Sequence, residues 1–441
     1  MNTRSRGNIV KIILLVLLAC VLVSAGAYQI PAVKERVAWR IESAWVRFRT
    51  LINPPEEITF VPQGLPAATL TPAATSTPDL PPTLTLTPEG PTLTPTLTPT
   101  PTLTATPLPQ WVSLSGVKYE TQRGRWNYCG PANLSMAMTF WGWDGNRDVV
   151  GQAVKPNEKD DKNVMPYEME NFVEDYTTDL AAVVRSGGNL DLIKRYIAAG
   201  FPVLVEKGYF ETDVDGNYTW MGHYQFVSGY DDSVEAMIVQ DTYLDGPDFY
   251  IKNDEFLEGW RSFNYLFLVV YPRVREEEVL ALLGDWVDPT WANQHALEIA
   301  RLETTTLTGV DQFFAWYNLG TSYVNLADYV SAAQAYDQAF MAYANLPDNN
   351  QRPFRMVWYQ TGPYFAYYYS ARYQDVLDLA NTTFATIQER LVLEESLYWR
   401  GMAKVALGDI TGAEEDFRRS LVIHPGFTPT LEAMRNLGLT P

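Results

Sequence analysis

Cysteine and histidine are both scarce in this chain. Its 441 residues include two cysteines, Cys20 and Cys129, which lie more than a hundred positions apart. Cys20 sits within an apolar run, so we expect no disulfide framework, and no CxxC pair suggests a zinc or redox motif. The three histidines, His223, His295 and His424, are too scattered for a zinc site. We therefore expect neither a metal nor another cofactor.

Positive charge is also in short supply. The chain has 33 Lys and Arg against 52 Asp and Glu, a formal net charge of −19. This balance, with no basic patch or aromatic RNA-binding motif, argues against nucleic acid as a partner. A hydrophobic fraction of 46% with 13% aromatics is enough for extensive cores. The length allows two or three domains.

The chain has a long apolar run without charged residues near its start. It reads IILLVLLACVLVSAGAY, 17 residues long, and three basic residues precede it. This length is at the short end for a membrane-spanning helix. We predict an uncleaved signal anchor over residues 1–30. Cleavage after Ala25-Gly26-Ala27 and lipidation of Cys20 remain alternatives.

The next segment, residues 31–53, has the pattern of an amphipathic helix on an anionic membrane surface. A short solvated helix packed on the anchor is the alternative. Its five basic residues outnumber the three before the anchor, so the positive-inside rule favours a cytoplasmic orientation. Its apolar residues form one helical stripe: Val33, Val37, Ile41, Ala44, Trp45, Phe48 and Leu51.

Residues 54–110 are rich in threonine and proline, as in LTPTLTPTPTLTATPLP. Repeated proline favours extended polyproline II and prevents a packed core. Forty-odd residues at about 3.1 Å each could reach on the order of 150 Å. We predict a stalk that holds the folded domains away from the membrane on the extracytoplasmic side. A flexible intracellular tether is the alternative.

Residues 111–273 have a globular composition, and they contain Cys129 in the sequence RWNYCGPANLSMAM. Gly130 and Pro131 open a helical stretch, because proline at a first helical turn lacks only an N–H that would be unpaired anyway. Cys129 therefore stands at a helix N-terminus, where the helix dipole favours a thiolate. It is a candidate nucleophile; a small buried hydrophobic residue is the structural alternative.

Two strand-like runs farther on, GHYQFVSGYDD and EAMIVQDTY, are joined by an acidic turn. As an antiparallel hairpin they would bring His223 and Asp241 to the same end of a sheet. A thiol nucleophile needs an imidazole base, a group that orients the imidazole, and a donor for the oxyanion. Cys129, His223, Asp241 and Gln122 supply these four parts. Alone, the histidine and the aspartate would be a core residue and a strand cap.

The segments QRGRWNYCGPANLSMAM, GHYQFVSGYD and IVQDTY together resemble the papain-like cysteine peptidases of the double-glycine leader peptidase-like family. That family is related to the domain that trims bacteriocin leaders. The resemblance implies an α+β papain-like domain in which the cysteine helix packs on an antiparallel sheet. It also implies Cys129 as nucleophile, His223 as base, Asp241 as the orienting residue and Gln122 as oxyanion donor. Leader-trimming members are fused to ATP-binding exporters, and this chain has no Walker loop, so the resemblance gives the reaction rather than the substrate.

Residues 276–441 carry helical repeats. WYNLGTSYVNLADYVSAAQAYDQAF and LYWRGMAKVALGDITGAEEDFRRSLVIHP match the tetratricopeptide spacing, and a looser copy starts at Trp358. We predict an all-α tetratricopeptide solenoid whose concave face binds a substrate or a protein partner. Ordinary packed helices are the alternative. His295 and His424 would then be solenoid residues without a catalytic role.

Together these features predict a membrane-anchored, extracytoplasmic cysteine peptidase that cleaves peptide or amide bonds through a Cys129 thioester. Two other functions use the same parts. The first is a catalytically silent adaptor in which the peptidase fold and the solenoid assemble partners. The second is another thiol acyl transfer, such as transamidation. The sequence does not specify the substrate.

Overall fold

The computed structural model describes Phe48 and residues 59–63, 107–125, 127–155, 163–212, 218–243, 245–346, 352–387 and 392–441. The predicted signal anchor, nearly all of the interfacial helix and most of the Thr/Pro stalk lie outside these ranges. Within the described residues, no helix has the length and apolar character that crossing a membrane requires.

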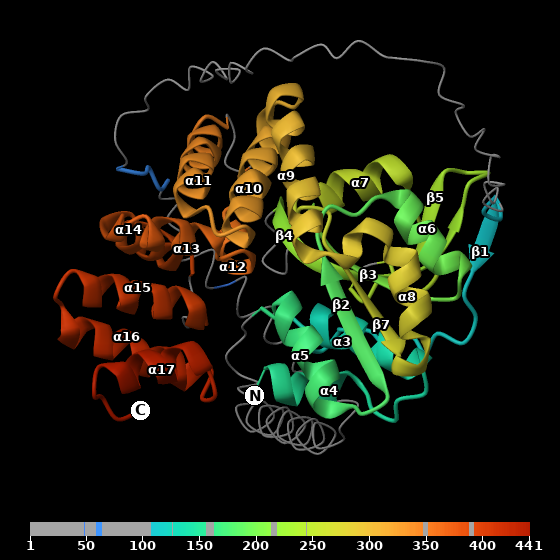
Figure 1. Cartoon of the computed structure of the whole chain (residues 1–441), viewed down its shortest axis with the longest axis horizontal. Helices are drawn as coiled ribbons and strands as arrows, with labels where there is room; N and C mark the ends of the chain where they lie inside the picture. The colour runs from blue at the N-terminus through green and yellow to red at the C-terminus, as the bar shows by residue number, and fades with distance from the viewer. Residues whose placement is uncertain are drawn as a thin grey trace, which may run out of the picture.

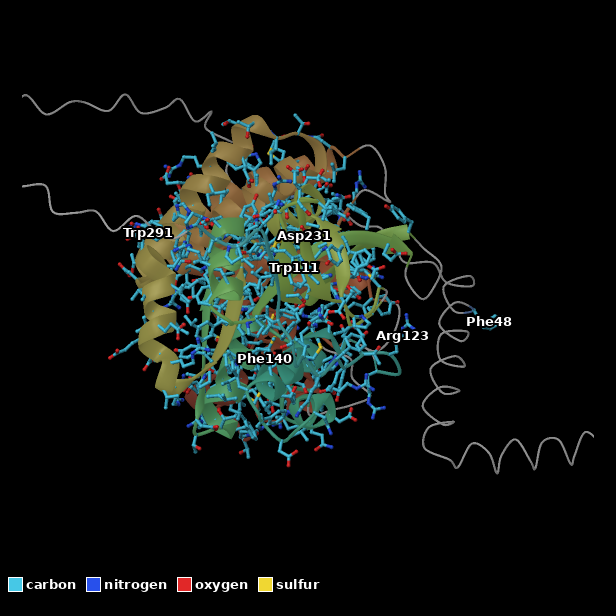
Figure 2. The ribbon with its side chains drawn as sticks, turned by 90° about the vertical axis from the view of Figure 1, so that its right-hand side faces the viewer. Phe48, Trp111, Arg123, Phe140, Asp231 and Trp291 are labelled. Carbon is cyan, nitrogen blue, oxygen red and sulfur yellow. The ribbon has the colours of Figure 1, made fainter. Side chains whose placement is uncertain are left out.

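A seven-stranded sheet, antiparallel throughout, forms the centre of the first folded region (Figure 1). Strands β2, β7, β3, β4, β5 and β6 follow in that order across the sheet, and β1 pairs with the end of β4. Trp111 of β1 lies opposite Asp231 of β4 (Figure 2). The strands are β1 (Trp111–Ser113), β2 (Leu180–Arg185), β3 (Val203–Thr212), β4 (Tyr218–Asp231), β5 (Ala236–Gln240), β6 (Phe249–Lys252) and β7 (Phe267–Pro272).

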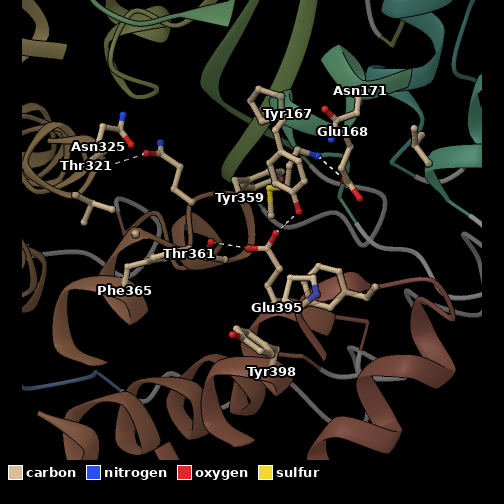
Figure 3. Close-up of a pocket in the computed structure, with 18 of the residues that line it drawn as sticks. Tyr167, Glu168, Asn171, Thr321, Asn325, Tyr359, Thr361, Phe365, Glu395 and Tyr398 are labelled. Atoms are coloured by element: carbon tan, nitrogen blue, oxygen red, sulfur yellow. Dashed lines mark hydrogen bonds between the residues drawn. The ribbon is translucent and has the colours of Figure 1, made fainter. Parts of the chain in front are cut away.

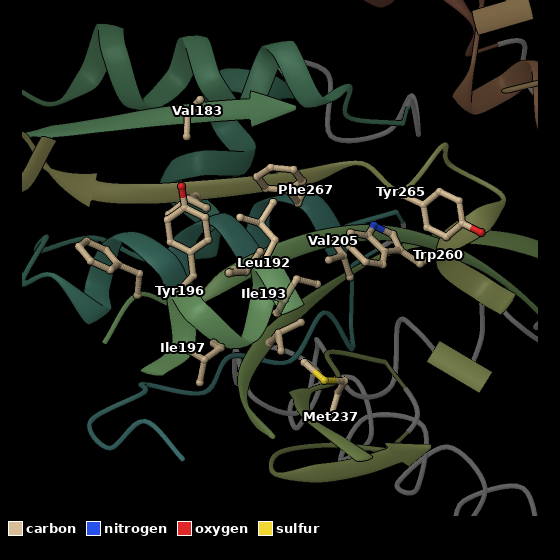
Figure 4. Close-up of a cluster of buried hydrophobic side chains, with 14 of the residues drawn as sticks. Val183, Leu192, Ile193, Tyr196, Ile197, Val205, Met237, Trp260, Tyr265 and Phe267 are labelled. Atoms are coloured by element: carbon tan, nitrogen blue, oxygen red, sulfur yellow. The ribbon is translucent and has the colours of Figure 1, made fainter. Parts of the chain in front are cut away.

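Helices cover both faces of this sheet. One face packs on α3 (Cys129–Phe140), α4 (Arg147–Val154) and α5 (Pro166–Tyr176). The other packs on α6 (Leu190–Ala198), α7 (Asn253–Arg261) and α8 (Glu276–Leu283). Helix α6 shows why: Leu192, Ile193, Tyr196 and Ile197 recur at helical spacing and are all fully buried (Figure 4). The α+β arrangement with the cysteine helix on an antiparallel sheet is confirmed.

The remainder of the chain is helical, as predicted. After the short 3₁₀ helices η1 (Arg273–Arg275) and η2 (Gly284–Val287), its helices pack mostly as antiparallel neighbours. They are α9 (Pro289–Thr306), α10 (Gly309–Asn325), α11 (Tyr329–Ala344), α12 (Met356–Tyr359), α13 (Gly362–Tyr369), α14 (Tyr373–Ala385), α15 (Glu394–Ala406), α16 (Ile410–Ile423) and α17 (Thr428–Asn436). We refer to residues 309–441 as the helical region and to β1 through α8 as the sheet domain.

The junction between these two parts differs from the boundary expected at residue 276. Val279 and Leu283 of α8, and Ala292 at the start of α9, belong to the core of the sheet domain. Tyr196 of α6 donates a hydrogen bond to the Val279 carbonyl over 3.0 Å. These helices therefore complete the covering of the sheet, a role that their amphipathic pattern alone does not reveal.

Two helix pairs pack in the same way, with a glycine on one helix facing an aromatic ring on the next. A Cβ added to Gly320 on α10 would come within 2.8 Å of the Tyr336 ring on α11. Gly401 on α15 has the same relation to Phe417 on α16, at 2.6 Å. The absence of a side chain on each glycine lets a large aromatic ring from the neighbouring helix fill the space.

The helical region is bound to the sheet domain through buried polar contacts. Asn318 Nδ2 donates to the Arg261 carbonyl over 2.6 Å, and Asn264 Nδ2 donates to Ser322 Oγ over 2.9 Å. Arg261 Nη1 also pairs with Asp311 Oδ1 of α10 at 3.1 Å. Because buried polar groups left unpaired are costly, these contacts define one docked arrangement of the two parts.

A short piece of the predicted stalk lies against the helical region. Phe60 is 5% exposed and meets Phe340 edge-on, with ring centroids 4.9 Å apart. The Gln63 backbone N–H donates to Asp375 Oδ1 over 2.7 Å, and Gln63 Nε2 donates to Asp378 over 2.9 Å. Residues 59–63 therefore dock on α11, α13 and α14.

Replacing Phe60 with alanine is expected to lower the free energy of unfolding of the helical region by about 3 kcal/mol, because it removes a buried aromatic ring. Thermal unfolding followed by circular dichroism measures the change. The neighbouring Val61→Ala is the matched control, since Val61 is 65% exposed. Equal midpoints for the two variants would contradict a stabilising role for this docked segment.

Candidate active site

Cys129 is the first residue of α3 and is partly buried. Its helix runs beneath the sheet with nearly all of its remaining residues buried. The N-terminus of α3 thus has a fixed position, while Cys129 at its end is less buried than the residues that follow it. A nucleophile that a substrate must reach requires this combination.

The predicted hairpin of β4 and β5 is present. Phe226 of β4 lies opposite Gln240 of β5, so His223 and Asp241 project beyond the same end of the pairing. Their closest approach is 3.4 Å, between His223 Nε2 and Asp241 Oδ2. This distance is longer than a short charge-assisted hydrogen bond, and His223 Nε2 has no partner of full hydrogen-bond geometry within the described residues.

Because Nε2 faces the carboxylate, the other ring nitrogen, Nδ1, is the one available to the thiol. The side chain of His223 makes a hydrogen bond with Cys129. The structure therefore brings nucleophile, base and orienting carboxylate into one chain of contacts. His223 and Asp241 are 4% and 5% exposed, which shields the pair from water.

Asn133, one turn into α3, joins the cysteine helix to the histidine strand. Its Nδ2 donates to the Cys129 carbonyl over 2.9 Å and to the Tyr224 carbonyl over 2.8 Å. The pairing of β5 with β4 starts only at Phe226, so α3 occupies the edge of β4 that β5 leaves open. Sequence analysis did not single out Asn133, since nothing in the local pattern separates it from other interior residues of the helix.

The Asp241 carboxylate is held from several sides. The Tyr243 backbone N–H donates to Oδ1 over 2.8 Å, and Gln225 Nε2 donates to Oδ2 over 3.1 Å. Tyr119 donates its hydroxyl to the backbone carbonyl of Asp241 over 2.8 Å, which holds the main chain there. The two hydrogen bonds to the carboxylate oxygens fix the direction of the carboxylate. Asp241 can thereby orient the imidazole and balance its charge.

Burial of the His223 imidazole opposes its charge and by itself would lower its pKa. The negative charge of Asp241 and the contacts with Asp241 and Cys129 outweigh this effect and raise the pKa to about 9. The protonated imidazole therefore stabilises the folded state fully below pH 6.5, and this contribution is lost as the pH rises through about 9.

The thiol shifts in the opposite direction. Burial raises the pKa of Cys129, but the hydrogen bond and charge of His223, with the backbone N–H groups of Tyr224 and Gly130, lower it below its ordinary value. A depressed thiol pKa beside a raised imidazole pKa favours the proton on the histidine rather than on the sulfur. Both shifts therefore favour a thiolate–imidazolium pair over a neutral thiol and imidazole.

Gln122 lies beside this group but does not contact the thiol among the described interactions. Its backbone N–H donates to the Thr242 carbonyl over 2.8 Å, and Thr242 Oγ1 donates to its Oε1 over 2.8 Å. Thr242 follows Asp241 directly, so Gln122 is fixed next to the carboxylate. Because Oε1 is engaged, Nε2 is the group that can donate to an oxyanion.

A buried carboxyl group that sequence analysis missed lies close enough to Cys129 for the charge of the thiolate to affect it. Glu206 of β3 is 4% exposed and hydrogen-bonds Tyr224. Burial raises its pKa far above its usual range, and the Cys129 charge raises it further. Glu206 is therefore held mainly as a neutral acid close to the nucleophile.

One group of side chains in the described part of the chain has the composition of a metal site. Glu168, Glu394 and His424 place ligand atoms within 4.8 Å of one another, and His424 Nδ1 lies 3.4 Å from Glu394. Two of the three residues come from the helical region. His295 stacks on Trp291 with ring centroids 4.8 Å apart. Neither histidine is part of the Cys129 group.

Replacing His223 with alanine is expected to shift the alkylation of Cys129 by iodoacetamide to higher pH. In the wild type the rate should rise well below the ordinary thiol pKa of about 8.5. Without the imidazole, burial is the dominant influence and raises the thiol pKa. The alkylation rate should therefore increase only above about pH 8.5. The matched control is His295→Ala, which should keep the wild-type profile. Superimposable profiles for wild type and His223→Ala would refute the thiolate–imidazolium pair.

Replacing Asn133 with leucine is expected to slow alkylation of Cys129 and to destabilise the fold, because two buried carbonyls lose their donor at about 1–3 kcal/mol each. Asn318→Leu is the control: it removes a comparable buried amide in the helical region and should destabilise the protein without changing alkylation. If both variants slowed alkylation equally, Asn133 would have only a structural role.

Residues 114–266, which contain all four candidate residues, match the Peptidase_C39 like family. No curated protein matches the chain. Among solved structures, the chain is similar to one described as a C39-like peptidase from Bacillus anthracis, with 17% identity over 37% of this chain and 99% of that one. Its TM-score of 0.31 is too low to carry an argument about the site. The family match supports a papain-like cysteine peptidase domain in this part of the chain.

Proposed function

We propose that the protein is a cysteine peptidase that hydrolyses peptide or amide bonds through a thioester on Cys129. The observation that carries this proposal is the single chain of contacts from Cys129 through His223 to Asp241. A merely structural cysteine would not need a buried imidazole whose own charge is balanced by a buried carboxylate.

In the first step of the proposed reaction, the Cys129 thiolate attacks the carbonyl carbon of the substrate. The carbonyl oxygen becomes an oxyanion, to which Gln122 Nε2 and the Cys129 backbone N–H donate. The His223 imidazolium then gives its proton to the leaving nitrogen, and the C–N bond breaks. The products of this step are a free amine and a thioester on Cys129.

In the second step, water attacks the thioester. Neutral His223 takes a proton from the water, a second oxyanion forms in the same place, and the C–S bond breaks. The acid product leaves, and the proton on His223 restores the thiolate–imidazolium pair. Asp241 keeps the imidazole in one orientation throughout both steps.

The setting of the domain is part of the proposal. The charge-free run and the basic amphipathic segment favour a single-pass membrane protein. The Thr/Pro stretch favours a folded part on the extracytoplasmic side. The helical region is proposed to be a tetratricopeptide array that presents substrate or binds a protein partner. The equivalent contacts of Gly320 with Tyr336 and of Gly401 with Phe417 support a repeated unit.

Hydrolysis is expected to disappear in Cys129→Ala and to fall by about 10²–10³ in kcat in Gln122→Glu, which keeps the acceptor for Thr242 but lacks the oxyanion donor. Mass spectrometry of a random-sequence peptide library incubated with each protein measures cleavage. Gln152→Glu on α4 is the control for an added charge, since Gln152 is exposed. Cleavage that survives in Cys129→Ala would overturn the proposed function.

A further inference from the structure

A cavity of about 1050 Å³ lies between the sheet domain and the helical region (Figure 3). Residues of α5 and β3 line it on one side, and residues of α10, α12, α13 and α15 line it on the other. Its volume is at the upper end of the range for ligand sites, so it can hold several amino-acid residues. We call it the acidic cleft.

One end of the acidic cleft adjoins the candidate active site. Glu206 and Tyr359 both line the cavity, and the charge of Cys129 acts on both of them. A Cβ on Gly222 would meet the Tyr359 ring at 3.0 Å, and Gly222 directly precedes His223. Tyr359 of the helical region is thus a neighbour of the catalytic strand, so this end of the cleft is directed toward the candidate active site.

The cleft is predominantly acidic. The carboxyl groups of Glu168, Asp175 and Glu395 line it beside the neutral Glu206, and its described lining residues include His424 but no lysine or arginine. Much of the remaining wall is aromatic, including Tyr398 and Trp399. Aromatic faces attract cations, and carboxylates pair with them. The wall therefore complements a positively charged side chain.

Glu395 projects into the cleft from α15 and is held at both oxygens. Tyr167 donates its hydroxyl to Oε1 over 2.8 Å, and Thr361 donates to Oε2 over 2.6 Å (Figure 3). Each oxygen therefore keeps a lone pair for a further donor. Burial raises the pKa of Glu395, and the charges of Glu394 and Glu168 add to the rise. A bound cation would relieve this unfavourable charge, as no lysine or arginine of the cleft wall does.

We infer that the acidic cleft binds the peptide substrate and selects a basic side chain, arginine or lysine, that pairs with Glu395 against the aromatic wall. That the bound peptide is a substrate rests on the proposed function; that the cleft prefers a basic peptide does not. The specificity of the thiol site is thereby assigned largely to the helical region, because Glu395, Tyr398 and Trp399 come from α15.

Peptide binding to the full chain carrying Cys129→Ala tests the inference without catalysis. The probe is a short fluorescein-labelled peptide of alanine and glycine with one central arginine, and fluorescence anisotropy gives Kd. The matched peptide carries citrulline, which has the shape of arginine without its charge. The arginine peptide is expected to bind about tenfold more tightly, the equivalent of about 1.4 kcal/mol. Equal affinities would overturn the inference.

The second arm repeats both titrations with Glu395→Gln added. This change keeps the size of the side chain and removes its charge, so most of the preference for arginine should disappear. A preference that persists at full strength would place the selecting group elsewhere and overturn the role of Glu395. If the double variant fails to fold, the comparison of the arginine and citrulline peptides on the Cys129→Ala protein still tests the inference.

The two proposals fail in different ways. Cleavage of library peptides by the wild type with no enrichment of basic residues near the cut would refute the selective cleft and leave the peptidase intact. Absence of cleavage, with the arginine preference retained in Cys129→Ala, would refute the peptidase and leave the basic-peptide cleft intact.

Discussion

A buried imidazole can carry a charge only if opposite charges are buried with it, and the site depends on this constraint. Desolvation by itself would keep His223 neutral and Cys129 protonated. The Asp241 carboxylate outweighs the desolvation of His223 and raises the pKa of its imidazole. The imidazolium in turn outweighs the desolvation of Cys129 and lowers the pKa of its thiol. Removing one partner would leave the others buried without compensation, which is strongly unfavourable. The positions of the cysteine helix, the histidine strand and the strand end that bears the aspartate are therefore linked energetically.

The fold meets this constraint through an incomplete sheet. Strand β4 extends beyond its pairing with β5, and the N-terminal turn of α3 occupies the open edge there. Asn133 joins the two backbones, so the thiol and the imidazole are positioned by secondary structure rather than by loops. The helical region also contributes residues near the site. Tyr359 contacts the glycine before His223, and Glu395 supplies a carboxyl group to the acidic cleft. Reaction and selection are thus assigned to different parts of one chain.

Local sequence patterns predicted the cysteine at a helix start and the hairpin that joins His223 to Asp241, because each depends on short-range periodicity or turns. The α+β domain was implied by the resemblance to a known family. The contacts that complete the site depend on long-range packing, which such patterns do not encode. Phe60 and Gln63 looked like ordinary residues of a proline-rich stalk, yet Gln63 bonds Asp375 across 312 positions. Asn133 and Glu395 resembled unremarkable helix residues for the same reason.

The most direct test is a pH titration of the histidine side chains by ¹³C NMR, which is simple because the chain has only three histidines. We expect one imidazole to titrate near pH 9 and its pKa to fall in both Cys129→Ala and Asp241→Asn. His223→Ala would identify the signal by its disappearance. If His223 instead titrated at or below its ordinary value of 6.5, the thiolate–imidazolium pair would not exist at neutral pH and the account of the site would be wrong.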